Sequence, residues 1–215
     1  MTGTAPRKRA LAPCLEGFEH INRYWDRQQE TYSAKILPGE FYVTRNDELI
    51  ATTLGSCVSA CIWDELSGIG GMNHFMLPLT EKQIHEVTWG NNLSDATRYG
   101  NYAMEHLVNE ILKNGGIRSK LKAKVFGGGR VLKTVTDIGD KNARFVIEYL
   151  STEKIPVLAE DLGDIYPRKI LFDPRSGRAR MKKIKSTHNE TIMQRERAYE
   201  KSLVQAPVEG DIELF

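Results

Sequence analysis

The chain has 215 residues and a formal net charge of +2, and 40% of its residues are hydrophobic, which is typical of one globular domain with short extensions. The small net charge excludes proteins that bind nucleic acid mainly through electrostatics, and no apolar run reaches the roughly 18 residues that a membrane-spanning helix needs. The three cysteines, Cys14, Cys57 and Cys61, are odd in number and irregularly spaced, which argues against a disulfide-stapled secreted domain. We therefore expect a cytoplasmic protein without membrane insertion.

The N-terminal part of the chain predicts an extension followed by strands. Residues 1–30 are polar and irregular, and we assign them to an N-terminal extension with a short helix near 18–29. Strand patterns rich in β-branched and apolar residues then occur at 34–37, 40–44, 49–54, 57–64 and 69–77. The last two strands are separated only by the short segment 65–68, so they predict a β-hairpin.

Two amphipathic helices and a second hairpin are predicted in the C-terminal part. Apolar residues recur at helical spacing between 104 and 112, and the glycines at 115–116 mark the end of this helix. A second helical pattern covers 142–152. Strands are expected at 121–126, 155–159, 169–173 and 178–184, and a charged helix from Thr187 to about Val204. We assign 31–185 to a single domain and 186–215 to a charged, partly helical tail. Hairpins mixed with two main helices predict a layered α/β sandwich of mostly antiparallel or mixed sheet.

A cysteine follows directly after one of the predicted strands. The bend Gly55-Ser56-Cys57 begins with two small residues, which let the backbone turn sharply and bring the Cys57 side chain to the rim of a sheet. A cysteine in this place is positioned like a nucleophile, but it needs a base because free thiols are mostly protonated at neutral pH. Backbone N–H groups near Gly55 and Ser56 are candidates for an oxyanion hole.

The predicted hairpin supplies a candidate base. If its loop holds two or four residues, Asp64 faces Ile69, and the same register places His74 opposite Ser59. Cys57 and His74 then point to the same side of the sheet as diagonal neighbours. A three-residue loop would put them on opposite faces, so the register of this hairpin tests the pairing.

Other interpretations use some of the same residues. A lone cysteine or histidine in an apolar strand is commonly a packed core residue. A zinc site would combine Cys57, Cys61 and His74 with His85, but the spacing of the two cysteines matches zinc ligands only loosely. The glycines at 127–129 lack the Gly-Lys-Ser/Thr ending of a phosphate-binding loop, and we expect a tight turn against the active-site strands. No metal and no organic cofactor is therefore expected.

Segments at 53–61, 71–78, 123–128, 138–142, 155–157 and 159–163 resemble the CheD family, the chemoreceptor glutamine deamidases of bacterial chemotaxis. The resemblance runs from about residue 36 to 184, and the Gly-Ser-Cys bend with a histidine 17 residues after the cysteine is its most specific part. It implies a cysteine hydrolase in a layered α/β fold that converts receptor glutamines to glutamates and releases ammonia. Cys57 would be the nucleophile and His74 the general base. Hydrolysis of glutamyl methyl esters would proceed through the same acyl-enzyme.

The third catalytic residue of the family is a threonine six positions before the cysteine, where this chain has Ala51. Thr53 lies two residues after Ala51, so the two side chains point to the same face of the strand, which favours Thr53. Thr52 is the alternative, through a shift of one residue. The sequence does not choose between the two threonines.

The resemblance also implies partners. The substrate glutamines would lie on the cytoplasmic domains of methyl-accepting chemotaxis receptors, which are long helical coiled coils, and CheC would be a regulatory partner. A site that accepts a glutamine from a helix surface should be open and shallow, and the loop 78–92 is a candidate for its rim. The competing interpretation is a non-catalytic receptor-binding chemotaxis adaptor that is regulated by CheC.

Overall fold

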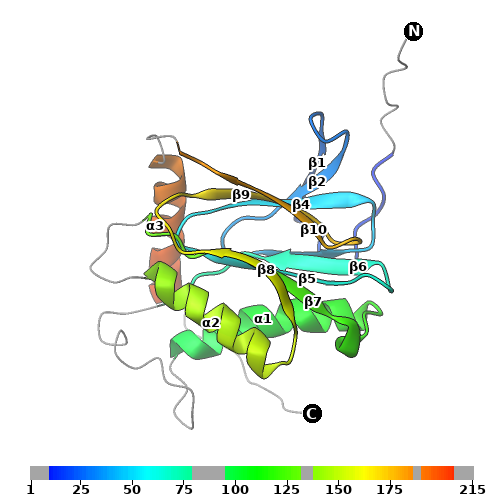
Figure 1. Ribbon diagram of the computed structural model, residues 1–215. Helices are drawn as coiled ribbons and strands as arrows, with labels where there is room; N and C mark the ends of the chain where they lie inside the picture. Colours follow the sequence, from blue (N-terminus) through cyan, green and yellow to red (C-terminus); the bar gives the residue numbers. More distant parts are fainter. Residues whose placement is uncertain (1–9, 79–94, 132–137, 186–189, 206–215) are drawn as a thin grey trace.

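The computed structural model describes residues 10–78, 95–131, 138–185 and 190–205. Two five-stranded sheets are stacked on each other, and two helices cover the outer side of one of them (Figure 1). This arrangement confirms the layered α/β sandwich with mixed sheets. The loop expected as a rim lies outside the described residues except for Pro78. Within the described ranges, no helix is long and apolar enough to cross a membrane.

The first sheet forms an outer layer and has the strand order β1-β2-β4-β9-β10. Its strands are β1 (Asn22–Asp26), β2 (Thr31–Lys35), β4 (Glu48–Leu54), β9 (Arg168–Asp173) and β10 (Arg178–Lys183). Strands β2 and β4 run parallel, and the other neighbours are antiparallel. Along β10 each exposed residue is followed by a half-buried one, as expected where one face of a sheet meets solvent.

The second sheet is the middle layer, with the order β3-β6-β5-β7-β8. Its strands are β3 (Phe41–Thr44), β5 (Val58–Asp64), β6 (Ile69–Asn73), β7 (Lys122–Gly127) and β8 (Val157–Leu162). Every residue of β5 is buried, because the first sheet covers one face of this strand and helices cover the other. A strand covered on both faces needs apolar or small residues throughout.

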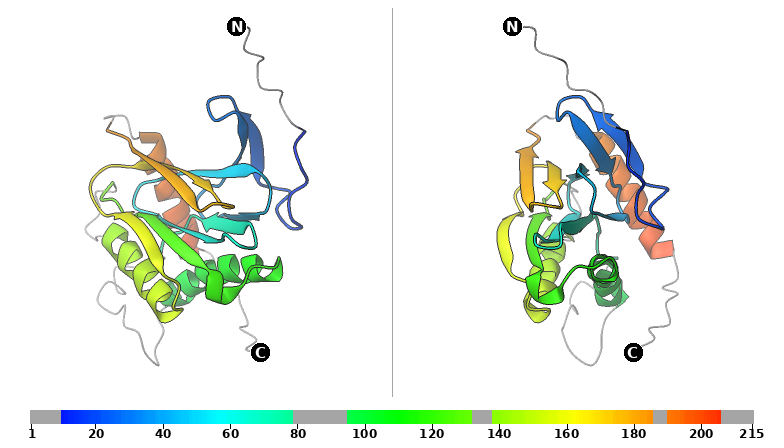
Figure 2. Two further views of the ribbon diagram at one scale, coloured as in Figure 1. Left: turned by 45° about the vertical axis from the view of Figure 1, so that its right-hand side comes forward. Right: turned by 90° about the vertical axis from the view of Figure 1, so that its right-hand side faces the viewer.

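The helices α1 (Asp95–Lys113) and α2 (Ile138–Thr152) pack on the second sheet, α1 mainly against β6 and β3 and α2 against β5 and β7. A short 3-10 turn at Arg118–Lys120 leads from α1 into β7. The third helix, α3 (Glu190–Gln205), stands apart from this layer (Figure 1). Figure 2 shows that α3 lies across one end of the two sheets instead of covering a face of either.

The expectation of a short helix near 18–29 is wrong, because residues 22–26 form strand β1. Strand β1 pairs antiparallel with β2, and Trp25 packs edge-on against Tyr32 across the pair. Phe18 and Ile21, from the same predicted extension, are buried in the core. Tyr24 and Trp25 are residues that favour strands, and the pairing with β2 fixes this conformation.

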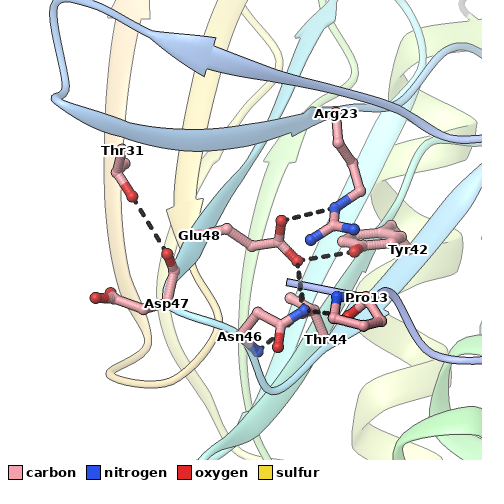
Figure 3. A network of polar contacts seen from close by, with 8 residues as sticks. All are labelled: Pro13, Arg23, Thr31, Tyr42, Thr44, Asn46, Asp47 and Glu48. Carbon is pink, nitrogen blue, oxygen red and sulfur yellow. Dashed lines mark hydrogen bonds and ion pairs between the residues drawn. The ribbon is translucent and has the colours of Figure 1, made fainter. Parts of the chain in front are cut away.

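A buried carboxylate joins the two sheets away from the candidate site (Figure 3). Glu48 of β4 accepts hydrogen bonds from Arg23 Nε at 2.9 Å, Tyr42 Oη at 2.8 Å and Thr44 Oγ1 at 2.7 Å. Strands β1 and β4 belong to the first sheet and β3 to the second. The ion pair and the two hydroxyl donors therefore compensate the buried charge and fix the spacing of the layers.

Candidate active site

The Gly-Ser-Cys bend carries the chain from one sheet to the other. Residues 55–57 directly follow β4 of the first sheet and precede β5 of the second. The Cys57 side chain is buried at this crossing. The bend thus lies at the end of the sandwich, where groups from both sheets and from α3 meet.

Each carbonyl group of the bend accepts a hydrogen bond. Gly128 N–H donates to the Cys57 carbonyl at 2.8 Å, and Gly129 N–H donates to the Gly55 carbonyl at 2.8 Å. The amide of Asn142, at the start of α2, donates to the Ser56 carbonyl at 2.9 Å. These contacts confirm the tight turn predicted for 127–129, and they satisfy the carbonyl groups of the bend without using its N–H groups.

Gly127 is required at this turn by both space and backbone conformation. Its φ is +114°, a region that side chains rarely adopt. A Cβ at this position would lie 2.2 Å from the Cys57 carbonyl oxygen. The close approach of β7 to the bend therefore depends on the missing side chain.

The hairpin register brings His74 to the cysteine. The pairing Asp64↔Ile69 and the bridge Val58↔Phe75 confirm the predicted register, in which a four-residue loop at 65–68 connects the strands. The backbone of His74 is further held by hydrogen bonds with residues 39 and 40. One ring nitrogen of His74 lies within 4.8 Å of Cys57 Sγ.

Thr52, and not Thr53, contacts His74. Thr52 Oγ1 lies 2.8 Å from His74 Nδ1 and donates its own proton to the Ile36 carbonyl at 2.9 Å. Because a hydroxyl has a single proton, Oγ1 must accept the hydrogen bond from an Nδ1–H group. Nε2 then carries the free lone pair of the imidazole, as a base for the thiol requires.

The preference for Thr53 is thus corrected by the structure. Successive residues of a strand point to opposite faces, so the buried Thr52 faces His74 while the half-buried Thr53 faces away from Thr52. Thr53 points to the same face of β4 as Ala51, but the contact with His74 is made from the opposite face. A shift of one residue exchanges the two faces.

A fourth residue at the site was missed by the sequence analysis. The carboxylate of Glu196, in α3, is buried with 2% of the residue exposed. Its Oε1 accepts hydrogen bonds from Gly55 N at 2.8 Å and Cys57 N at 3.2 Å. Its Oε2 accepts from Ser56 N at 2.8 Å and Ser56 Oγ at 2.7 Å. The N–H groups expected to form an oxyanion hole therefore do converge, and they bind a carboxylate.

Signals for the missed residues were present but weak. Asn142 occurs in one of the family-like segments, but nothing local shows that its amide bridges the Ser56 carbonyl and the Leu77 N–H. Glu196 interrupts an otherwise apolar stripe of the tail helix, formed by Ile192, Met193, Tyr199 and Leu203. A single acidic residue in the middle of such a stripe indicates a buried partner.

Burial and charge keep the thiol and the imidazole neutral in this arrangement. Burial raises the pKa of the Cys57 thiol well above its ordinary value, and the neighbouring Glu196 carboxylate raises it further. Burial alone lowers the pKa of His74 to about 3. Both shifts favour the uncharged forms, a protonated thiol beside a neutral imidazole.

The same three residues have the composition of a metal site, but their surroundings favour an anion. Ligand atoms of Cys57, His74 and Glu196 lie within 4.8 Å of one another. Both carboxylate oxygens, however, already accept hydrogen bonds from N–H or O–H groups. Donors that converge on one point favour negative charge there. Cys61 is not part of this group, and His85 lies outside the described residues.

Fold and site together define a two-sheet α/β protein with a buried cysteine, histidine and threonine next to converging backbone N–H donors. Residues 76–183 match the family model described as CheD chemotactic sensory transduction. The chain belongs to the CheD family.

Curated relatives match nearly the whole chain. The probable chemoreceptor glutamine deamidase CheD of Halorhodospira halophila is 54% identical, over 94% of this chain and 93% of its own. Its counterparts from Hahella chejuensis and Methylobacillus flagellatus are 50% and 54% identical and cover 94% and 90% of this chain, or 93% and 95% of their own lengths. Among solved structures, the hypothetical protein YfiH of Bacillus licheniformis is 13% identical over 56% of this chain and 49% of its own, with a TM-score of 0.37.

Proposed function

We propose that this chain is a cytoplasmic enzyme that deamidates glutamine side chains on the cytoplasmic helices of methyl-accepting chemotaxis receptors. The observation that carries the proposal is the binding of a side-chain carboxyl group by the N–H groups of residues 55–57, next to Cys57 and His74. A nucleophile, a base and oxyanion donors around one side-chain carbonyl group are the parts that glutamine hydrolysis needs. The names of the relatives support chemoreceptors as the substrate.

The first half of the reaction forms a thioester. His74 Nε2 takes the proton of the Cys57 thiol, and the thiolate attacks the side-chain amide carbon of the glutamine. The N–H groups of Gly55 and Cys57 stabilise the oxyanion that develops. The imidazolium then gives its proton to the departing nitrogen, so the C–N bond breaks and ammonia leaves.

The second half releases glutamate. Water gives a proton to His74 and attacks the thioester carbon; the C–S bond breaks and the thiolate is regenerated. A cavity of about 70 Å³ beside His74, also lined by Thr52 and Glu196, has room for water. Thr52 acts as a positioning residue, because it holds the Nδ1–H group and so keeps Nε2 available. A glutamyl methyl ester would form the same thioester with methanol as the leaving group.

The test is incubation of the purified protein with a receptor cytoplasmic fragment, followed by mass spectrometry of glutamine-containing peptides. We expect the wild type to convert particular glutamines to glutamates, and Cys57→Ala and His74→Ala to lose this conversion. Cys61→Ala is the matched control, because Cys61 is a second buried cysteine on the same side of the sheet. Conversion by Cys57→Ala at the wild-type rate would show that the nucleophile is another residue.

The adaptor alternative and the CheC partner are tested in the same system. An adaptor would bind the receptor fragment without converting any glutamine, and Cys57→Ala would not impair its function. For CheC, which the family resemblance supports, we expect a complex in solution and a change in the deamidation rate when CheC is added. Unchanged rates and the absence of a complex would remove CheC from the proposal.

A further inference from the structure

The side chain that fills the site comes from the protein itself. Glu196 lies at the middle of α3, and its carboxylate accepts four hydrogen bonds from the Gly55-Ser56-Cys57 bend. A carboxylate oxygen also lies within 4.8 Å of Cys57 Sγ. A Cβ on Gly55 would come within 2.6 Å of this carboxylate, so the bend leaves space for a carboxyl or amide group at this point.

Besides Glu196, one face of α3 packs against the hydrophobic core. Met193, Tyr199 and Leu203 pack against the core, and they lie three or seven residues from Glu196, on the same side of the helix. The hydroxyl groups of Tyr199 and Tyr99 of α1 are hydrogen-bonded. Gly39 lets the Tyr199 ring approach the backbone, since a Cβ there would lie 2.9 Å from the ring. The surface beneath α3 is therefore shaped for a helix that presents one side chain to Cys57.

The chemistry of Glu196 corresponds to the product of the reaction. Deamidation of a glutamine on a helix leaves a glutamate on a helix, with its carboxylate next to the nucleophile. The bend also prefers the acid to the amide. Ser56 N–H donates to Oε2, and an amide NH₂ in that place would set one donor against another.

We propose that α3 is a built-in product mimic, which occupies the docking site of the substrate helix and places Glu196 where the deamidated side chain would lie. The inference rests on the proposed function and adds the regulation of the same site. A receptor helix must displace α3 to deliver its glutamine. Because α3 is tethered, it competes at an effective concentration that reaches the millimolar range for short linkers. The resting enzyme is consequently held in a closed state.

The variant Glu196→Gln turns the mimic into a substrate. The Cys57 thiol gives its proton to His74, and sulfur bonds to the side-chain amide carbon of residue 196. The C–N bond breaks and ammonia leaves with the proton from His74. Water then forms a C–O bond at the thioester carbon, the C–S bond breaks, and residue 196 is a glutamate again. Water is the only co-reactant that the step consumes.

Self-conversion is measured on the full chain by peptide mass spectrometry. We expect residue 196 of the Glu196→Gln variant to be recovered as glutamate, at a rate independent of protein concentration. The double variant Cys57→Ala, Glu196→Gln should keep the amide. Gln194 is an internal control, because it lies on the exposed face of the same helix and should remain glutamine in every sample.

The outcomes separate the two proposals. If residue 196 stays an amide while the same preparation deamidates the receptor fragment, the product-mimic inference is overturned and the proposed function stands. If neither is converted, the proposed function fails, and the inference fails with it. Conversion of residue 196 together with Gln194, or conversion in the Cys57→Ala background, would also overturn the inference.

A second variant tests the competition without self-conversion. Glu196→Ala should raise kcat/KM for the receptor fragment by about tenfold or more, because the charged hydrogen bonds that close the site are lost. It should also speed the alkylation of Cys57 by iodoacetamide, with the half-buried Cys14 as internal reference. Arg197→Ala, at an exposed position of α3, is the matched control and should change neither rate. Equal rates for Glu196→Ala and the wild type would overturn the inference.

Discussion

Thr52 Oγ1 and His74 Nδ1 are joined by a 2.8 Å hydrogen bond, and the same hydroxyl donates to the Ile36 carbonyl at 2.9 Å. The carbonyl fixes the direction of the hydroxyl proton, and the hydroxyl oxygen in turn fixes the tautomer of the imidazole. Thr52 thereby decides which ring nitrogen of His74 carries the proton, and Nε2 is left with the free lone pair.

Replacement of Thr52 should impair the chemical step. We expect Thr52→Ala to lower kcat for the receptor fragment on the order of 10²-fold, because the imidazole loses its orientation and its tautomer preference. Thr52→Ser keeps the hydroxyl and should recover most of the activity, while Thr53→Ala should remain close to the wild type. The measurement is kcat and KM of the four proteins; a Thr53→Ala variant as impaired as Thr52→Ala would contradict the assignment.

Burial of His74 should make the closed protein sensitive to acid. Its pKa is lowered from 6.5 to about 3, so the folded state favours the neutral ring. This contribution to the free energy of unfolding is fully present above the unfolded pKa and is lost as the pH falls from 6.5 toward 3. Urea unfolding near neutral pH and at about pH 4 should show a smaller loss of stability for His74→Gln than for the wild type.

An exposed histidine provides the control for that experiment. His106 lies at an exposed position of α1, and His106→Gln should keep the acid sensitivity of the wild type. If His74→Gln and His106→Gln lose the same free energy between the two pH values, burial of His74 is not the cause.

Two glycines with positive φ should respond differently to alanine. Gly127→Ala places a Cβ 2.2 Å from the Cys57 carbonyl oxygen, whereas Gly163, with φ +73°, has no other heavy atom within 4 Å of that position. Gly163→Ala should cost only the backbone strain of about 1–2 kcal/mol. Gly127→Ala adds a steric clash and should lower both the free energy of unfolding and the deamidation rate, as measured by denaturation and peptide mass spectrometry. Equal costs at the two positions would contradict the proposed packing of the bend.

Loss of the buried Glu48 carboxylate should affect stability rather than chemistry. In Glu48→Gln the Arg23 guanidinium stays buried without its counter-charge, and we expect a loss of about 3–5 kcal/mol in the free energy of unfolding. Glu65→Gln removes a partner from the exposed pair with Lys122 and should cost less than about 1 kcal/mol. Chemical denaturation gives both values, and a similar cost for the two variants would show that the network does not join the layers as described.

Much of the candidate site follows from local pattern. The small residues before Cys57 predict a bend, and the hairpin register predicts that His74 lies on the same side of the sheet. Both inferences hold because strand pairing has a fixed period of two, so one pair of opposite residues determines all the others. The layered fold follows in the same way from hairpins and amphipathic helices.

The remaining features depend on contacts between segments that are far apart in the chain. The sequence contains Thr52 and Thr53 side by side, and only the packing of β4 against the segment after β6, which carries His74, selects Thr52. Glu196 lies 139 positions after Cys57, and its role depends on α3 crossing the end of both sheets. Burial of a charged group requires donors already in place, and no local pattern shows that three N–H groups of a distant bend provide them.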